Sequence, residues 1–251
     1  TFRNDLLDQY KATRKETPDG LKCQFAMVRE FLEAYQIPYY EMEGYEGDDL
    51  IGTLSKLGEE QGLTVSIFTG DKDAFQLVSN QTTVYRTVKG VTQLDVYTPA
   101  TLDEKYGLKP DQIRDFLGLM GDSADNIPGI KGVGEKTALK LLHEYGTIEN
   151  LKEHMNEIKG KMGEKIRENI DLGLQSKKIA TILRDIPMTL DFNQARYNGY
   201  DFEKLKAFYT HYDMNSLLKK ISVESRKEQK TDFQYEVVHT MPLIQEDSSI
   251  L

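Results

Sequence analysis

The chain has 251 residues, 39% of them hydrophobic and 29% charged, which is the composition of a folded protein with one large domain or two modest ones. No apolar run approaches the roughly 20 residues that cross a bilayer, and no signal peptide is visible, so no membrane partner is expected. The single cysteine, Cys23, excludes an internal disulfide and fits a reducing cytoplasm. The formal net charge of −9 is unusual for a nucleic-acid-binding protein, unless carboxylates hold divalent cations that neutralise them locally.

Basic and aromatic side chains are interleaved in the first 15 residues. Arg3, Lys11 and Arg14 lie among Phe2 and Tyr10. This pattern can grip a single nucleic-acid strand through phosphate contacts and base stacking. The surface of a solvated helix explains the same pattern equally well, so both interpretations stay open.

Apolar periodicity predicts an amphipathic helix at residues 21–35, with Phe25, Val28, Phe31 and Leu32 on its buried stripe. The next four residues, 37–40, resemble a short edge strand.

A first acidic cluster precedes a second predicted helix. Glu46, Asp48 and Asp49 stand within four residues, just before a helical apolar pattern. The free N–H groups and dipole of a helix start explain one or two acids. Three acids repel one another unless a cation offsets their charge.

A second acidic cluster follows a predicted strand. Residues 62–69 are apolar and β-branched, which indicates a buried strand, and Asp71 and Asp73 stand at its carboxyl end, where open α/β sheets place ligands. Residues 82–97 predict a hairpin at the sheet edge, followed by a helix at 98–105.

From residue 109 the pattern is helical. Helices are expected at 111–119, 135–145, 148–158 and 164–183, with two more within 201–221. Asp122 and Asp125 form a third acidic cluster, and a helical turn would place both carboxylates on one face. Gly129–Gly134 indicates a glycine hairpin that opens into a helix, whose N–H groups suit a phosphate.

These patterns predict an α/β core at 1–108, a helical region at 109–221, a polar linker at 222–234 and the start of a following domain at 235–251.

Seven carboxylates without a matching set of histidines or cysteines indicate hard, oxygen-preferring cations, Mg²⁺ or Mn²⁺. Two such ions about 4 Å apart can activate a water and stabilise the leaving oxygen of a displacement at phosphorus. The acidic clusters therefore predict metal-dependent chemistry on a phosphodiester.

The motifs at Tyr45–Ile51, Thr69–Asp73 and Gly121–Ala138 closely resemble, in order and spacing, those of the 5′ nuclease domains of bacterial DNA polymerases I, in the flap endonuclease family. The likeness runs from Thr1 to about Ile221. It implies a PIN-like α/β core, with a mixed, largely parallel sheet flanked by helices, and an all-α helix-hairpin-helix module. It also implies a 5′-3′ exonuclease or flap endonuclease that acts on flaps, nicks, 5′ ends and RNA primers during replication and repair, covalently continuous with polymerase domains. The resemblance further implies that the following domain is similar to a proofreading exonuclease.

The resemblance also implies roles for single residues. Glu46 and Asp48 would serve one metal ion; Asp48, Asp71, Asp73 and Asp122 would serve the other, with Asp49 and Asp125 in the outer shell. Arg3, Lys11 and Arg14 would stabilise the scissile phosphate. The duplex-binding residues would be Ser123, Gly129, Lys131, Gly132, Val133, Gly134, Lys136 and Thr137, and a K⁺ ion would bind at the hairpin through backbone carbonyls and Ser123.

The sequence departs from the family pattern at its start. Family members begin with a strand carrying an aspartate and reach a second aspartate before the position of Thr1. We therefore expect this chain to be impaired as a nuclease and to expose sheet edges that favour aggregation.

Three other functions are compatible with parts of the pattern. A non-catalytic, structure-specific DNA-binding module is the first. A PIN-type ribonuclease shares the acidic α/β site but normally lacks the module at Gly129–Gly134. An acidic protein-interaction scaffold leaves the three spaced clusters unexplained.

Overall fold

The computed structural model describes residues 1–90 and 92–230. These fall into two compact units, the first made of residues 1–18 and 40–195 and the second of residues 19–39 with the described residues from 196 onward. The first unit thus joins the predicted α/β core to most of the predicted helical region. None of the described helices is long and apolar enough to cross a membrane.

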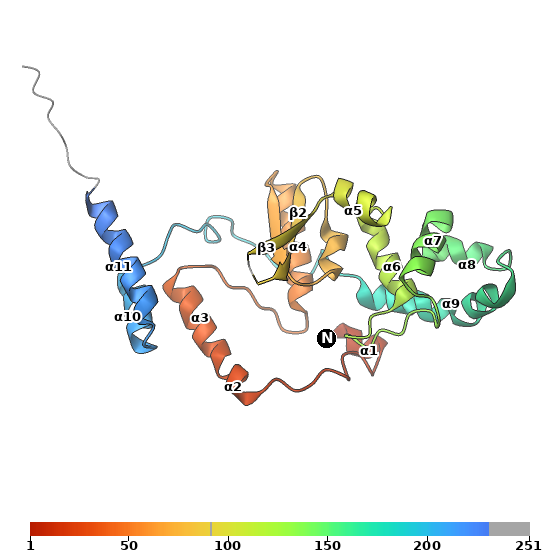
Figure 1. The fold of residues 1–251 in the computed structure, drawn as a ribbon, viewed down its shortest axis with the longest axis horizontal. Coiled ribbons are helices and arrows are strands. Elements are labelled where there is room, and N and C mark those ends of the chain that lie inside the picture. Colours follow the sequence, from red (N-terminus) through yellow and green to blue (C-terminus); the bar gives the residue numbers. More distant parts are fainter. Residues whose placement is uncertain (91, 231–251) are drawn as a thin grey trace, which may run out of the picture. The chain divides into compact units, whose positions relative to one another are not determined.

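The first unit contains all three strands of the described chain, together with most of its helices (Figure 1). Its elements are α1 (Phe2–Leu6), α4 (Gly47–Glu60), β1 (Val65–Thr69), the 3₁₀ helix η1 (Asp73–Leu77), β2 (Thr82–Lys89), β3 (Gln93–Tyr97), α5 (Pro99–Tyr106), the 3₁₀ helix η2 (Pro110–Gln112), α6 (Ile113–Met120), α7 (Glu135–Tyr145), α8 (Ile148–His154) and α9 (Gly160–Ala180).

The sheet is mixed, in the order β1-β2-β3. β1 pairs with β2 in parallel, and β2 pairs with β3 as an antiparallel hairpin. The predicted strand at 62–69 and the predicted hairpin are therefore confirmed. The prediction that this strand is buried is only partly right: Ile67 is buried, whereas Phe68 is 63% exposed and stacks on Tyr85 of β2.

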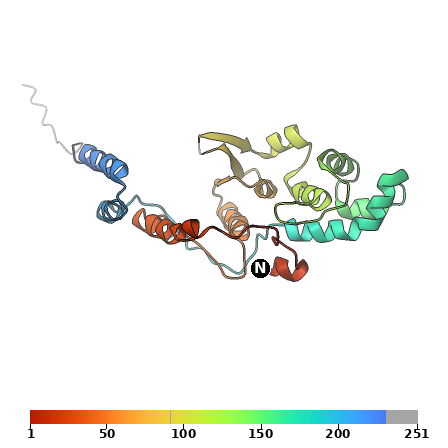
Figure 2. The ribbon, with the colours of Figure 1, turned by 60° about the horizontal axis from the view of Figure 1, so that its bottom comes forward.

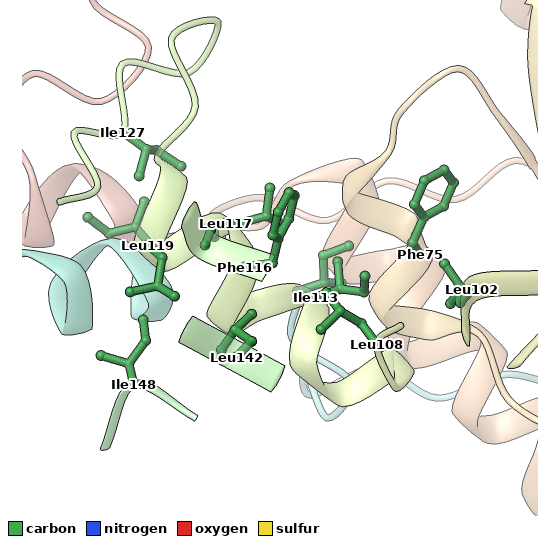
Figure 3. Packing of buried hydrophobic residues seen from close by; sticks show 14 of the residues in the cluster. Phe75, Leu102, Leu108, Ile113, Phe116, Leu117, Leu119, Ile127, Leu142 and Ile148 are labelled. Atoms are coloured by element: carbon green, nitrogen blue, oxygen red, sulfur yellow. The ribbon is translucent and has the colours of Figure 1, made fainter. Parts of the chain in front are cut away.

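One hydrophobic core connects the sheet to the helices. Figure 3 shows its side chains running from Phe75 and Leu102 through Ile113 to Leu119 and Ile148. Helix α6 supplies the middle of this layer, and α9 lies beside it in both ribbon views (Figure 2). Because apolar surface is removed from water on both sides of α6, this helix holds the two predicted parts together.

The loop between α6 and α7 carries the third acidic cluster, and it is not helical. Asp122 and Ile127 instead exchange backbone hydrogen bonds across a short reversed loop. The prediction of a helical turn here is wrong. Gly129 has φ +61°, and a Cβ there would lie 2.4 Å from the backbone nitrogen of Gly121, so close backbone contact requires glycine. Helix α7 begins at Glu135, as predicted.

The second unit contains α2 (Asp19–Lys22), α3 (Gln24–Ala34), α10 (Phe202–His211) and α11 (Asn215–Lys230). The predicted buried stripe of α3 is partly wrong, because Phe25 and Val28 are more than half exposed. Met27 and Phe31 instead face a small cluster formed with Phe208 of α10. The expected edge strand at residues 37–40 does not form.

Part of the predicted linker is also helical, since residues 222–230 continue α11. Lys, Glu, Arg and Gln are good helix formers, and this preference outweighs the lack of an apolar pattern. The predicted following domain at residues 235–251 lies outside the described residues.

Candidate metal and nucleic-acid site

One pocket of the first unit receives residues from the second and third acidic clusters. It has a volume of about 650 Å³, and we call it the acid pocket. Its lining residues are Arg14, Gly70, Asp71, Lys72, Asp73, Arg86, Leu117, Met120, Gly121, Asp122, Ser123, Ala124 and Asp125. Four carboxylates predicted from two separate motifs therefore face one hollow.

Asp73 is the most strongly perturbed of these acids. It stands at the start of η1, four residues after the end of β1, and its backbone N–H donates to Asp71 Oδ1 at 2.9 Å. Burial raises the pKa of Asp73 to about 7, and the negative charges of Asp71, Asp122 and Asp125 add to the effect. A cation in the acid pocket would relieve both causes, because it replaces lost solvation and offsets the neighbouring charges.

Asp48, in the first turn of α4, belongs to the same electrostatic neighbourhood. Burial and the charge of Asp71 raise its pKa above the usual range. Because Asp48 and Asp71 come from different motifs, the effect of the Asp71 charge on Asp48 indicates that the tertiary structure brings the first and second acidic clusters together.

Two acids of the predicted metal site, Glu46 and Asp125, have cationic partners from the first 15 residues. The Lys11 ammonium lies 2.5 Å from Glu46 Oε2 and 3.6 Å from Asp125 Oδ2, and Arg14 donates to Asp125 Oδ1 at 2.5 Å. A backbone hydrogen bond from the Lys11 N–H to the Asp125 carbonyl, 2.9 Å long, fixes this contact. Two of the three basic residues assigned to DNA thus lie beside the predicted metal ligands.

Tyr10, which the sequence analysis named only as a possible stacking ring, contacts the acids of the site. Its side chain is buried, and its hydroxyl lies 3.2 Å from Glu46 Oε2 and 3.3 Å from Asp125 Oδ2. Burial, with the charge of Glu46 next in importance, raises its pKa well above the usual range, so the hydroxyl stays protonated and donates. The basic-aromatic pattern pointed to Tyr10 as an aromatic ring, but nothing in the sequence showed that its hydroxyl meets Glu46 and Asp125.

Two predicted site residues have a different role in the structure. Arg3 is 3% exposed and Asp49 is fully buried, and they form a two-fold hydrogen-bonded ion pair at 2.7 and 2.8 Å. Burial alone would raise the pKa of Asp49, but the hydrogen bonds from Arg3 and from the Leu183 N–H outweigh it and lower that pKa. Neither residue lines the acid pocket, and both are occupied by this ion pair. The outer-shell role of Asp49 and the phosphate contact of Arg3 stay predictions.

The donor chemistry of the acid pocket fits Mg²⁺ or Mn²⁺, since its side chains offer carboxylate oxygens. In residues 1–90 and 92–230, however, no three acidic, histidine or cysteine side chains stand close enough together to hold one ion as they are arranged. Lys11 and Arg14 occupy Glu46 and Asp125 in this arrangement, so binding of an ion there requires these cations to give up their partners.

The predicted duplex-binding residues lie at the start of α7 and in the loop before it. Ser123 is exposed and lines the acid pocket, and Lys131 and Lys136 are also exposed. Gly132 has φ +82° and lies against Lys165, which adds a further cation from α9. Val133 is buried in the core, so only its backbone can meet a ligand. The free N–H groups at the start of α7 are suited to a phosphate.

We expect opposite effects when the Lys11 and Arg14 charges are removed. The Lys11→Gln/Arg14→Gln variant should bind Mn²⁺ about three- to tenfold more tightly in calorimetry, because Glu46 and Asp125 lose competing partners. If Lys11 and Arg14 bind phosphate as the family resemblance implies, the double variant should also bind a 5′-flap duplex more weakly in Mn²⁺. Lys15→Gln is the matched control on the same segment. Weaker Mn²⁺ binding by the double variant would contradict this competition.

Comparison with known proteins assigns the chain to a family. Residues 1–107 match the model of the 5′-3′ exonuclease N-terminal resolvase-like domain, and residues 108–203 match that of the 5′-3′ exonuclease C-terminal SAM fold. The chain is 47% identical over 231 residues to DNA polymerase I of Bacillus caldotenax and 46% identical over 226 residues to that of Bacillus subtilis. These alignments cover 92% and 90% of this chain but 26% of each relative.

Solved structures agree on the fold. A structure of zinc bound to T5 5′-exonuclease has a TM-score of 0.58 at 21% identity and covers 71% of this chain and 69% of that one. The catalytic core of Rad2 in complex with DNA substrate has a TM-score of 0.53 at 17% identity, with 84% and 69% covered. The predicted α/β core with a helical module is therefore confirmed, and the chain belongs to the 5′-3′ exonuclease family.

Proposed function

We propose that this chain is the 5′ nuclease part of a DNA polymerase I and that it hydrolyses phosphodiesters at 5′ flaps, nicks, 5′ ends and RNA primers, using two divalent cations, Mg²⁺ or Mn²⁺. The observation that carries the proposal is the acid pocket, where Asp71, Asp73, Asp122 and Asp125 from two separate motifs gather. Two relatives in the comparisons point the same way: the T5 5′-exonuclease structure contains divalent metal ions, and the Rad2 core contains DNA substrate.

Bound divalent ions would supply activation of a water and stabilisation of the leaving oxygen at phosphorus. The chain's own residues would divide the remaining work. Asp48, Asp71, Asp73 and Asp122 would hold the ions. Lys11 and Arg14 would meet the phosphate of the strand once they leave Glu46 and Asp125, and the start of α7 would hold the duplex, with a K⁺ ion near Ser123.

We further propose that the isolated chain cleaves weakly. Its support is the pairing of Glu46 and Asp125 with Lys11 and Arg14, which competes with an ion for the same oxygens. The single cysteine favours a cytoplasmic location, which stays a prediction.

A non-catalytic DNA-binding module is the second candidate, favoured by the salt-bridged state of Glu46 and Asp125. The two functions separate in one experiment on a labelled 5′-flap duplex with Mg²⁺ or EDTA. It uses this chain and a longer protein, in which the chain is preceded by the segment with the strand and the two aspartates that the family resemblance implies. The nuclease proposal expects Mg²⁺-dependent cutting near the junction by the longer protein, lost in its Asp122→Ala variant. Binding of the flap without any cutting by either protein would replace it with the binding module.

A further inference from the structure

Arg86 is a cation of the acid pocket that no motif suggested. It lies on β2, two residues after the buried Val84, and so begins on the core side of the strand. In the sheet it pairs with Thr69, the residue that leads through Gly70 to Asp71. The parallel pairing of β1 and β2 thus places Arg86 beside the acids at the carboxyl end of β1, and its side chain lines the acid pocket with them.

Arg86 differs from three basic residues of the first 15 positions because it has no acidic partner within the described residues. Arg3 is paired with Asp49, Lys11 with Glu46 and Arg14 with Asp125. Arg86 has no ion pair and no side-chain hydrogen bond within residues 1–90 and 92–230, and its Nε is buried. Buried polar groups are normally hydrogen-bonded, so this guanidinium is available to a partner of opposite charge.

The chemistry of that partner follows from the surroundings. Asp71 and Asp73 line the same pocket, yet neither is close enough to Arg86 to form an ion pair. A guanidinium presents several N–H donors in a planar fork that matches phosphate oxygens, and a pocket of about 650 Å³ has room for a phosphate beside it.

We propose that Arg86 binds a phosphate of the nucleic-acid strand that enters the acid pocket. This inference rests on the proposed function, since it takes the strand to be the substrate. It assigns Arg86 a task distinct from that of Lys11 and Arg14: Arg86 holds the strand whether or not metal is bound, whereas Lys11 and Arg14 must first leave carboxylates. The competing explanation is that the positive charge of Arg86 only makes the electrostatic potential around Asp71 and Asp73 less negative.

Binding in EDTA tests the proposal without requiring cleavage. Arg86→Gln should weaken binding of a 5′-flap duplex about tenfold and reduce the slope of log affinity against log salt by about 1. Arg86→Lys keeps the positive charge but loses the planar fork of donors, so its DNA affinity should lie between those of the wild type and Arg86→Gln. Lys89→Gln, an exposed cation on the same strand, is the matched control for net charge and should change affinity about twofold or less.

Two further readouts separate the explanations. The phosphate role predicts that the Kd for Mn²⁺ is unchanged in Arg86→Gln and that any loss of cleavage is a higher KM at constant kcat. Unchanged DNA affinity with tighter Mn²⁺ binding would overturn it in favour of the electrostatic role. DNA binding without cleavage by either this chain or the longer protein would refute the nuclease proposal, whereas the effect of Arg86→Gln on DNA affinity would still decide the role of Arg86. If Arg86→Gln fails to fold, the test uses Arg86→Lys. A DNA affinity of Arg86→Lys equal to that of the wild type would then refute the inference.

Discussion

Arg3→Met should destabilise the first unit by about 3–5 kcal/mol, because it leaves the fully buried Asp49 carboxylate without its cation. Arg3 also donates to the carbonyls of Ile179 and Thr181, at 2.8 and 2.9 Å, and Asp49 accepts from the Leu183 N–H at 3.0 Å. The pair therefore ties α1 and the start of α4 to the end of α9. Urea unfolding followed by circular dichroism measures the loss, which is a large share of the stability of an ordinary domain.

A double variant distinguishes the ion pair from simple packing. Arg3→Met/Asp49→Leu should recover most of the lost stability, since apolar side chains of similar volume often replace a buried pair without cost. Lys152→Met is the surface control: its pair with Asp171 has the same 2.7 Å length but is exposed, so it should cost less than about 1 kcal/mol. If the double variant is no more stable than Arg3→Met, the unpaired carboxylate is not the cause.

The same pair predicts a pH dependence. Arg3 holds the pKa of Asp49 below its unfolded value of 3.8. The folded state therefore releases the Asp49 proton more readily than the unfolded state does. Its contribution is fully present above pH 3.8 and is lost as the pH falls through the lower folded pKa. The stability difference between wild type and Asp49→Asn should thus narrow in acid, which unfolding curves between pH 2 and pH 6 would show.

Asp73→Asn should make the metal-free protein more stable and the nuclease inactive. The pKa of Asp73 is raised from 3.8 to about 7, so the folded state holds this proton to higher pH than the unfolded state does. Ionised Asp73 therefore destabilises the fold progressively between pH 3.8 and about 7, and by a constant amount above. In EDTA at pH 8 the variant should gain about 1–3 kcal/mol, less than the full linkage value because neighbouring carboxylates share the titration. At pH 4 the gain should nearly vanish.

A bound metal ion should reverse the stability difference between the wild type and Asp73→Asn. Mg²⁺ should raise the Tm of the wild type, because a bound ion offsets the repulsion around Asp73, and should raise that of Asp73→Asn much less. In the longer protein, Asp73→Asn should reduce cleavage of a 5′-flap duplex by more than about 100-fold, since even mutation of residues that only orient metal ligands causes losses of that size. Asp103→Asn, an exposed acid on α5, should change neither property. A lower Tm of Asp73→Asn in EDTA would show that Asp73 is not repelled by its neighbours.

Local patterns in the sequence determined much of what this protein is. Three clusters of acids could be recognised in the sequence: Glu46–Asp49, Asp71 with Asp73, and Asp122–Asp125. They indicated a cation because like charges repel one another when nothing offsets them. Residues close together in the sequence also set the hairpin of β2 and β3, and the structure confirms it. The same holds for the start of α7 after Gly134. These features were enough to identify the family.

The tertiary structure alone decided which charges meet. Arg3 and Asp49 have no partner along the sequence, and only the fold buries them as a pair 46 positions apart. Tyr10 and Arg86 enter the site because distant elements bring Glu46, Asp71 and Asp125 to them. Which face of α3 is buried, and whether Asp122 and Asp125 share a helix, likewise depend on long-range packing and backbone pairing rather than on spacing. Sequence spacing lists the available charges, but desolvation and distance, which decide what each charge does, are properties of the folded chain.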